Sequence, residues 1–275
     1  MRWLHSLGRR KVRASEPKPM VFFVPHQDDE YLTFGLAILR ASQTHDVHVV
    51  LCTDGSLDDT RNQLGSGKRC YLPELGKGRR IHFGRHRYDI SVQEFIGIRD
   101  EEFRTGCELL GVRPNNVHIA PNRAVDGSLS PDLASEIIRD YLSTLPEAVV
   151  CTEVPIDCPL YDPNAPGYSD VYHADHHALG NGARMLFESG QITELVYYAD
   201  PYYLQLFKDA APHIDFKALV PNQTELGALR KAAKAYRRWR PSRRQFAVAW
   251  HSASPLFPQI TGDWNNYFYQ VKPTK

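Results

Sequence analysis

Four short apolar runs, separated by segments with helical spacing, constrain the fold of this chain most strongly. Each run has the length of a buried strand; they cover residues 21–24, 47–53, 117–120 and 148–154. Helical patterns lie between them, at residues 32–41, 98–111 and 132–145. This alternation predicts an α/β fold of the Rossmann-like type, with a mostly parallel sheet and helices on both faces.

The length and composition predict one large core. The chain has 275 residues, of which 42% are hydrophobic, enough for a single α/β domain. We expect that domain to cover residues 20–275 and residues 1–19 to form a flexible leader without a secretory signal. Residues 55–97 and 155–172 resist regular assignment and predict irregular loops at the rim of the domain. Helical spacing between Leu226 and Trp239 predicts a final long helix.

Net charge, cysteine content and hydropathy indicate which partners and which cellular location to expect. The formal net charge is +1, so bulk charge favours neither a nucleic acid nor a membrane surface as partner. Five scattered cysteines without a C-x-x-C pair fit a reducing, cytoplasmic location. No stretch reaches the roughly 18 apolar residues of a membrane span. The basic segment 230–244 is interpreted as the solvated face of a helix, which makes nucleic-acid binding unlikely. The oligomeric state stays open.

An acidic cluster follows the first apolar run. The sequence PHQDDE, residues 25–30, places His26 next to Asp28, Asp29 and Glu30. Adjacent like charges repel, and their unpaired burial is costly, so these groups are either solvated or gathered by a cation. Ligands bind beyond the carboxyl ends of strands in such sheets, which favours a binding site here.

A second cluster supplies more possible ligands. The sequence YHADHHALG, residues 172–180, carries His173, Asp175, His176 and His177 near the start of a helix. His173 and His176 are three residues apart, so one turn can bring them to one side. Catalytic zinc sites usually take three protein ligands and leave one position for water. The two clusters together therefore predict a metal site, whereas the spaced pairs His82/His86 and His45/His48 lack a carboxylate cluster at a strand end.

The same residues resemble a known family. PHQDDE is similar to the signature (A/P)-H-P-D-D-E of the LmbE-like, or GlcNAc-phosphatidylinositol de-N-acetylase, family, and HADH is similar to its second signature, H-P-D-H. LCTDG (51–55) resembles the end of the family's second strand. IRDEEFRTGCELLGV (98–112) resembles its R-x-x-E helix, and together the matches run from residue 21 to about 180 in the family's order.

The resemblance implies a zinc-dependent enzyme that removes an acetyl group from an N-acetylated amino sugar. His26, Asp29 and His176 would hold one zinc ion, which activates water and polarises the amide carbonyl. Asp28 would be the general base and His173 the group that stabilises or protonates the transition state. Asp175 would orient His173 and favour its charged form.

The resemblance also suggests substrate contacts. Arg99 and Glu102 match the R-x-x-E positions, although an i,i+3 surface ion pair explains them equally well. Asp126 resembles a family aspartate that contacts sugar hydroxyls, but it is also typical of a turn before Gly127.

The chain departs from the pattern in places. Gln27 and Ala174 replace prolines of the two signatures. Val171 stands where some members carry a catalytic tyrosine, so a role for Tyr172 or Tyr168 as acid stays open.

The favoured function is thus N-deacetylation of a small amino-sugar compound, which could carry an anionic group. One alternative is a metal-dependent hydrolase of a phosphoester or a non-sugar amide. Another is a glycan-binding pseudoenzyme that holds metal without turnover, which would not need Asp28.

Overall fold

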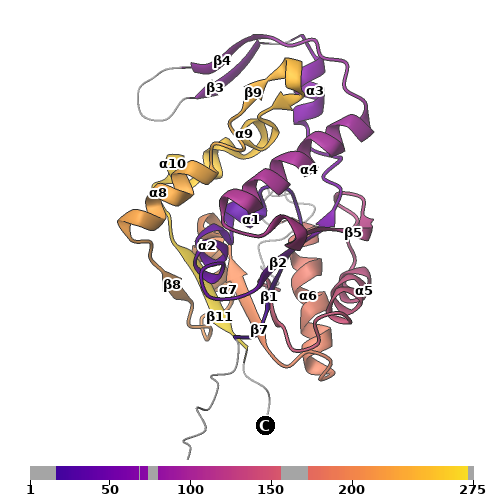
Figure 1. Ribbon diagram of the computed structural model, residues 1–275, viewed down its shortest axis with the longest axis vertical. Coiled ribbons are helices and arrows are strands. Elements are labelled where there is room, and N and C mark those ends of the chain that lie inside the picture. Colours follow the sequence, from indigo (N-terminus) through magenta and orange to yellow (C-terminus); the bar gives the residue numbers. More distant parts are fainter. Residues whose placement is uncertain (1–16, 68, 74–79, 156–172, 272–275) are drawn as a thin grey trace, which may run out of the picture.

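Seven strands form one mixed sheet in the order β5-β2-β1-β6-β7-β11-β8 (Figure 1). The computed structural model describes residues 17–67, 69–73, 80–155 and 173–271. The five strands from β5 to β7 run parallel, and β11 and β8 add an antiparallel edge. The strands of this sheet are β1 (Met20–Val24), β2 (Val47–Thr53), β5 (Val117–Ala124), β6 (Val149–Glu153), β7 (Leu195–Ala199), β8 (Lys217–Leu219) and β11 (Asn266–Gln270). The predicted fold class is therefore confirmed.

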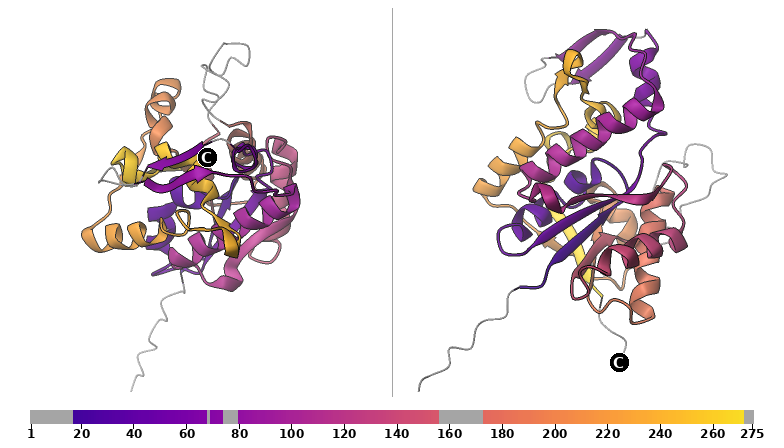
Figure 2. Two further views of the ribbon diagram at one scale, coloured as in Figure 1. Left: turned by 90° about the horizontal axis from the view of Figure 1, so that it is seen from above. Right: turned by 45° about the vertical axis from the view of Figure 1, so that its right-hand side comes forward.

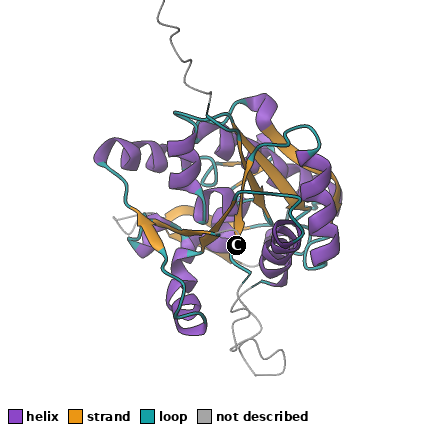
Figure 3. Cartoon of the chain, turned by 90° about the horizontal axis from the view of Figure 1, so that it is seen from below, coloured by secondary structure: helices purple, strands orange, loops and turns teal. Residues whose placement is uncertain are grey.

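Helices cover both faces of this sheet (Figures 2 and 3). The α-helices are α1 (Asp29–Leu32), α2 (Gly35–Ala41), α3 (Thr60–Gly65), α4 (Val92–Leu109), α5 (Pro131–Leu142), α6 (Ala174–Glu188), α7 (Leu204–Ala210), α8 (Gln223–Ala232), α9 (Val248–Ala253) and α10 (Pro258–Thr261). Short 3-10 helices are η1 (Pro114–Asn116), η2 (Pro201–Tyr203), η3 (Pro241–Arg243) and η4 (Ser254–Leu256).

Strand β1 is buried on both faces and separates two hydrophobic cores. Phe22 and Val24 pack against α2, α4, α8 and α9 on one side. Val21 and Phe23 face α5, α6 and α7 on the other. Successive side chains of a strand point to opposite faces, so the unbroken apolar run predicted this double burial.

Strand β1 also lies where the chain order of the parallel strands reverses. Its neighbours are β2 on one side and β6 on the other. Helix α2, which follows β1, and helix α6, which follows β6, cover opposite faces of the sheet, and α/β sheets bind ligands at such a switch point. His26 follows β1, and α6 with His176 follows β6, so the topology brings the two predicted clusters together.

The helix predicted at 32–41 is divided in two. Helix α1 ends at Leu32 and α2 begins at Gly35. The hydroxyl of Thr33 donates a hydrogen bond to Asp200, and the ring of Phe34 packs edge-to-face on Phe22. These two buried contacts turn the chain between the helices, which periodicity alone did not indicate.

Residues 55–97 are more regular than predicted. They contain α3, a two-stranded hairpin of β3 (Arg69–Pro73) and β4 (Arg80–Arg85), and the start of α4. Helix α4 begins earlier than expected because Ser91 and Glu94 form a reciprocal capping box. Of the other predicted rim loop, residues 156–172 lie outside the described part of the chain.

The predicted final helix is also shorter. Helix α8 ends at Ala232, and Trp239 instead lies in β9 (Trp239–Arg240), which pairs with β10 (Gln245–Phe246). Pro241 cannot continue a helix or donate to one, and the Trp239 ring packs against Phe246. The basic segment 230–244 is therefore not one helix face. Within it, the guanidinium of Arg237 lies over Trp250.

None of the helices in the described ranges combines the length and the apolar character needed to cross a bilayer.

Gly106, inside α4, is the tightest point between this helix and its neighbours. A Cβ atom there would lie 1.9 Å from the hydroxyl of Tyr236 and 2.8 Å from a carboxylate oxygen of Glu30. We expect Gly106→Ala to lower the free energy of unfolding by about 1–3 kcal/mol or more, because the buried pair must move. Chemical denaturation measures this effect.

Gly97, on the exposed side of the same helix, provides the matched control. No neighbour lies within 4 Å of a Cβ atom built there. Alanine should stabilise this position by about 0.5–1 kcal/mol through helix propensity. Equal effects of the two substitutions would contradict the packing argument.

Candidate metal centre

Three donor atoms from the two predicted clusters meet at the carboxyl end of the sheet. His26 Nδ1 lies 3.2 Å from His176 Nε2 and 3.2 Å from Asp29 Oδ2. The remaining side of the triangle, from His176 Nε2 to Asp29 Oδ2, is 3.3 Å. All three residues are buried. The structure thus brings together the three residues predicted to be metal ligands.

This triangle fits the donor set of a zinc ion. Four ligands at about 2.0–2.1 Å around a tetrahedral centre lie about 3.3–3.4 Å from one another, close to the three observed distances. Two imidazole nitrogens and a carboxylate are also ligand types that zinc accepts. Within the part of the chain that the structure describes, this donor group contains three protein ligands.

The carboxylates around His26 and His176 favour a positive charge at this position. Burial alone would lower the pKa of His26, but hydrogen bonds to Asp126, Asp175 and Asp29 raise this pKa well above its usual value. The same balance raises the pKa of His176, where burial is outweighed mainly by Asp29 and Asp200. In the metal-free protein these imidazoles therefore bind protons, which a divalent ion would displace.

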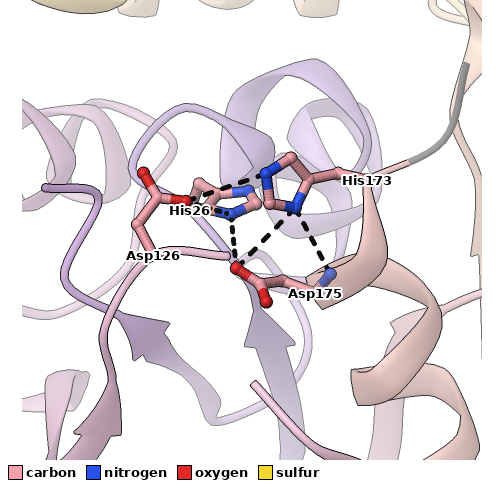
Figure 4. A group of neighbouring side chains, drawn as sticks. All are labelled: His26, Asp126, His173 and Asp175. Carbon is pink, nitrogen blue, oxygen red and sulfur yellow. Dashed lines mark hydrogen bonds and ion pairs between the residues drawn. The ribbon is translucent and has the colours of Figure 1, made fainter. Parts of the chain in front are cut away.

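The second nitrogen of His26 faces two further carboxylates. His26 Nε2 lies 3.1 Å from Asp175 Oδ2 and 3.3 Å from Asp126 Oδ1, and Figure 4 shows both around the ring. Asp175 is itself held by the backbone N–H groups of Gly127 and Leu129. We assign the proton of a metal-binding His26 to Nε2, so that Nδ1 presents a lone pair. Asp175 thus orients His26 more directly than His173, whose Nδ1 lies 3.7 Å away.

His173 has a more open position than the other two histidines. Its side chain is 47% exposed, and its Nδ1 accepts a hydrogen bond from the backbone N–H of Asp175 at 3.3 Å. Burial and the neighbouring His26 and His176 lower the pKa of His173 to about 4, although Asp175 opposes them. This pKa favours a neutral ring in the metal-free protein, and its Nε2 lies 3.8 Å from Asp126 Oδ1 at the cavity wall.

Asp28 lines the cavity beside the triangle, outside the donor group, and lies near Arg99. Its Oδ1 atom lies 3.8 Å from Arg99 Nη2. Arg99 is buried, and its Nη1 contacts Asp58 Oδ2 at 3.1 Å and the carbonyl of Gly55 at 3.0 Å. Burial raises the pKa of Asp28 to about 8, against the opposing charge of Arg99. This carboxylate consequently holds a proton more firmly than an ordinary aspartate.

The turn at Asp54-Gly55 supports this arrangement. Gly55 has φ +62°, and a Cβ atom there would lie 2.1 Å from Gln27 Oε1. The amide of Gln27 donates to the carbonyl of Asp54 and to Asp100. The glutamine in place of the family's proline therefore ties the loop after β1 to β2 and α4.

Glu30, the third acid of the cluster, faces the opposite side. It is fully buried and accepts a hydrogen bond from the hydroxyl of Tyr236. Burial raises its pKa well above the usual value, which favours the protonated carboxyl. The three acids thus have separate environments: Asp28 lines the cavity, Asp29 contacts the two histidines, and Glu30 lies in the core against Tyr236.

The two remaining predicted substrate contacts differ in position. Asp126 lines the cavity, and its Oδ2 accepts the backbone N–H of Leu57. Glu102 does not reach the cavity. Its two oxygens accept the backbone N–H groups of Val248 and Ala249 at the start of α9. Glu102 therefore anchors the start of α9. In this structure it forms neither of the two predicted contacts, a surface ion pair or a contact with the cavity.

A cavity of about 580 Å³ opens beside the donor triangle. This volume is typical of small-molecule sites. Besides the residues already placed, its wall includes Tyr202 and Tyr203 from η2. Burial raises the pKa of Tyr202 well above its usual value, so its phenol keeps its proton and is a hydrogen-bond donor. Tyr168, Val171 and Tyr172, which bear on the question of a catalytic tyrosine, lie outside the described residues.

Sequence reasoning missed Tyr202 and two acids behind His176, Glu153 and Asp200. Both acids end or follow apolar runs, at the carboxyl ends of β6 and β7. The rule that ligands bind beyond the carboxyl ends of parallel strands, which indicated His26, therefore also applies to these two acids.

The rival pair His45/His48 forms no comparable site in the described part of the chain, and the side chain of His82 lies outside it. Among the described residues, every group of donor atoms close enough to hold an ion includes His26 or His176. His48 instead contacts the hydroxyl of Tyr141 and stacks on His118. His86 packs against Tyr88 and Trp239.

Comparison with solved structures shows which proteins share this fold. A deacetylase triple mutant of the teicoplanin biosynthetic pathway is 16% identical, with 94% of this chain and 99% of that chain covered and a TM-score of 0.58. The A40926 pseudoaglycone deacetylase Dbv21 is also 16% identical, with the same coverage and a TM-score of 0.56. GalB, the 4-carboxy-2-hydroxymuconate hydratase from Pseudomonas putida KT2440, is 15% identical, with 94% and 98% covered and a TM-score of 0.51.

Sequence comparison gives the family itself. No curated protein matches the chain significantly. The profile of the PIG-L family, described as GlcNAc-PI de-N-acetylase, matches residues 21–187, which are more than half of the chain. The order of the two signatures agrees with that match. This chain therefore belongs to the GlcNAc-PI de-N-acetylase family.

Proposed function

We propose that this protein is a zinc-dependent hydrolase that removes an N-acetyl group from a small amino-sugar compound. The donor triangle of His26, Asp29 and His176 beside a sugar-sized cavity carries the proposal. Family membership supports the same reaction. The teicoplanin and A40926 proteins that share the fold are also named deacetylases.

The three residues of the triangle would hold the ion. Zinc bound there would supply an acidified water and a polarised amide carbonyl. The residues around it would complete the site, since an amide also needs a proton acceptor for the water and hydrogen bonds to the carbonyl oxygen.

Asp28 is the proposed acceptor of the water proton. It lies outside the donor triangle, and burial has raised its pKa toward neutral values, as a general base requires. Arg99 would hold the carboxylate in place after its proton has passed to the leaving amine.

His173 and Tyr202 are the proposed hydrogen-bond donors to the carbonyl oxygen. His173 Nε2–H and the phenol of Tyr202 both belong to groups that line the cavity. Both are neutral donors, so neither needs to be charged before the substrate binds. Asp126, beside His173, is placed to accept hydrogen bonds from sugar hydroxyls.

The charge of the cavity argues against an anionic substrate group. Of the described residues that line it, Arg99 is the only cationic one by formal charge, and its guanidinium is already engaged by Asp58 and Gly55. We therefore propose a neutral N-acetyl amino sugar over a phosphorylated one.

Product analysis tests this proposal. The zinc-loaded protein should release equimolar acetate and free amine from members of a panel of N-acetyl amino sugars. Release of inorganic phosphate from phosphosugars would instead support a phosphoesterase. Binding of the panel without any product would support the pseudoenzyme.

A further inference from the structure

Two buried acids lie on the side of His176 that faces away from the donor triangle. Asp200 Oδ2 lies 3.4 Å from His176 Nδ1, and Glu153 Oε1 lies 3.8 Å from the same nitrogen. Both acids are 0% exposed. They come from the ends of two adjacent parallel strands, β6 and β7. No sequence signature described above includes either residue.

The position of Asp200 bears directly on how His176 can bind a metal. A neutral imidazole that offers its Nε2 lone pair must carry its proton on Nδ1. Metal-binding histidines usually donate that second N–H to a carboxylate, which fixes the tautomer and the ring orientation. Asp200 is the nearer of the two acids and has an oxygen in position to accept it.

Asp200 is itself held in place. Its other oxygen, Oδ1, accepts a hydrogen bond from the hydroxyl of Thr33, between α1 and α2. This contact links the carboxylate to the segment that carries Asp29, the third ligand. Glu153 differs, because its nearer oxygen lies 3.8 Å from His176 Nδ1, too far for a hydrogen bond to that nitrogen.

We propose that Asp200, anchored by Thr33, is a positioning residue that sets the metal affinity of the site through His176. It does not touch the ion or the substrate. The strand end of β7 is thus a third segment of the metal centre, in addition to those after β1 and β6. This inference rests on the metal site of the proposed function.

Zinc affinity of the full chain provides the test, measured by competition with a chromophoric chelator on metal-free protein. Asp200→Asn should bind zinc about 10–100-fold more weakly than the wild type, the range typical of lost outer carboxylates. Its amide can present N–H to Nδ1 and so favour the tautomer that blocks Nε2. Glu153→Gln, an equally conservative change in the same pocket, should stay within about threefold of the wild type, because this acid lies beyond hydrogen-bond distance of His176 Nδ1.

Each outcome has a separate meaning. Equal zinc affinity of wild type and Asp200→Asn would overturn the inference and leave the proposed function intact. Equal weakening by both variants would overturn the assignment to Asp200 alone. A wild-type protein that binds no zinc would overturn the proposed metal site itself.

A second variant covers the case in which Asp200→Asn does not fold. Thr33→Val keeps the shape of the side chain and removes the hydroxyl that anchors Asp200 and also contacts Glu153, whose own effect the Glu153→Gln variant measures. We expect about a threefold or larger loss of zinc affinity, because the carboxylate is then free to turn away. Unchanged affinity in a folded Thr33→Val protein would contradict the inference. Denaturation of both proteins without zinc separates this effect from a general loss of stability.

Discussion

Asp28→Asn is expected to bind one zinc ion as tightly as the wild type and to lose about 10²–10⁴-fold in the rate of acetate release, the usual contribution of a general base. The amide keeps the size of the side chain and its position near Arg99, but it cannot accept a proton. Asp28 lies outside the donor triangle, so the metal should stay. Zinc content and initial rates on the same preparation measure the two effects.

A control substitution of the same kind is available on the surface. Asp132 is exposed in the first turn of α5 and is not among the residues that line the cavity. Asp132→Asn should therefore leave both the zinc content and the initial rate unchanged. If Asp28→Asn loses zinc as well, the division between base and ligand is wrong. If it keeps full activity, the proposed mechanism fails.

The two histidines of the second cluster should respond differently to replacement by alanine. His176→Ala removes one corner of the donor triangle, and the dialysed protein should retain no zinc and no activity. His173→Ala removes a proposed hydrogen-bond donor only. It should retain a full equivalent of zinc while turnover falls about 10²–10³-fold.

This comparison separates a ligand from a non-ligand, because both histidines lie near His26 and sequence position alone does not tell which of them binds the ion. The rings of His173 and His176 have their centroids 4.5 Å and 5.1 Å from that of His26. Loss of zinc in His173→Ala with retention in His176→Ala would assign the ligand to the other histidine. Loss in both would place both in the metal site.

The sequence predicted those parts of the fold that depend on local pattern. Unbroken apolar runs such as 47–53 indicated the parallel strands, because strands covered on both faces need no polar side chain. The position of His26 directly after β1 then placed the acidic cluster at the binding edge of the sheet. The family's signatures added the pairing with His176, 150 residues further along the chain.

Contacts between distant residues could not be predicted in the same way. Helix 32–41 is divided because Thr33 meets Asp200 and Phe34 meets Phe22, contacts that no local pattern encodes. Glu102 has the spacing of a substrate-binding residue, yet it anchors α9, almost 150 positions later. The apolar spacing in 226–239 continues past the end of α8 because Trp239 is partly buried for another reason, its packing against Phe246 in a small hairpin.

The side chains of Asp28, Asp29 and Glu30 have three different environments, so the loop that carries them tolerates neither an insertion nor a deletion. Each residue has a different environment: Asp28 lies beside Arg99, Asp29 contacts His26 and His176, and Glu30 is buried against Tyr236. Removing or adding one residue after His26 would shift all three by one place at once. We therefore expect changes of sequence length to be excluded from this loop and to be tolerated in longer segments that border the cavity, such as the one that contains Leu57 and Gln63.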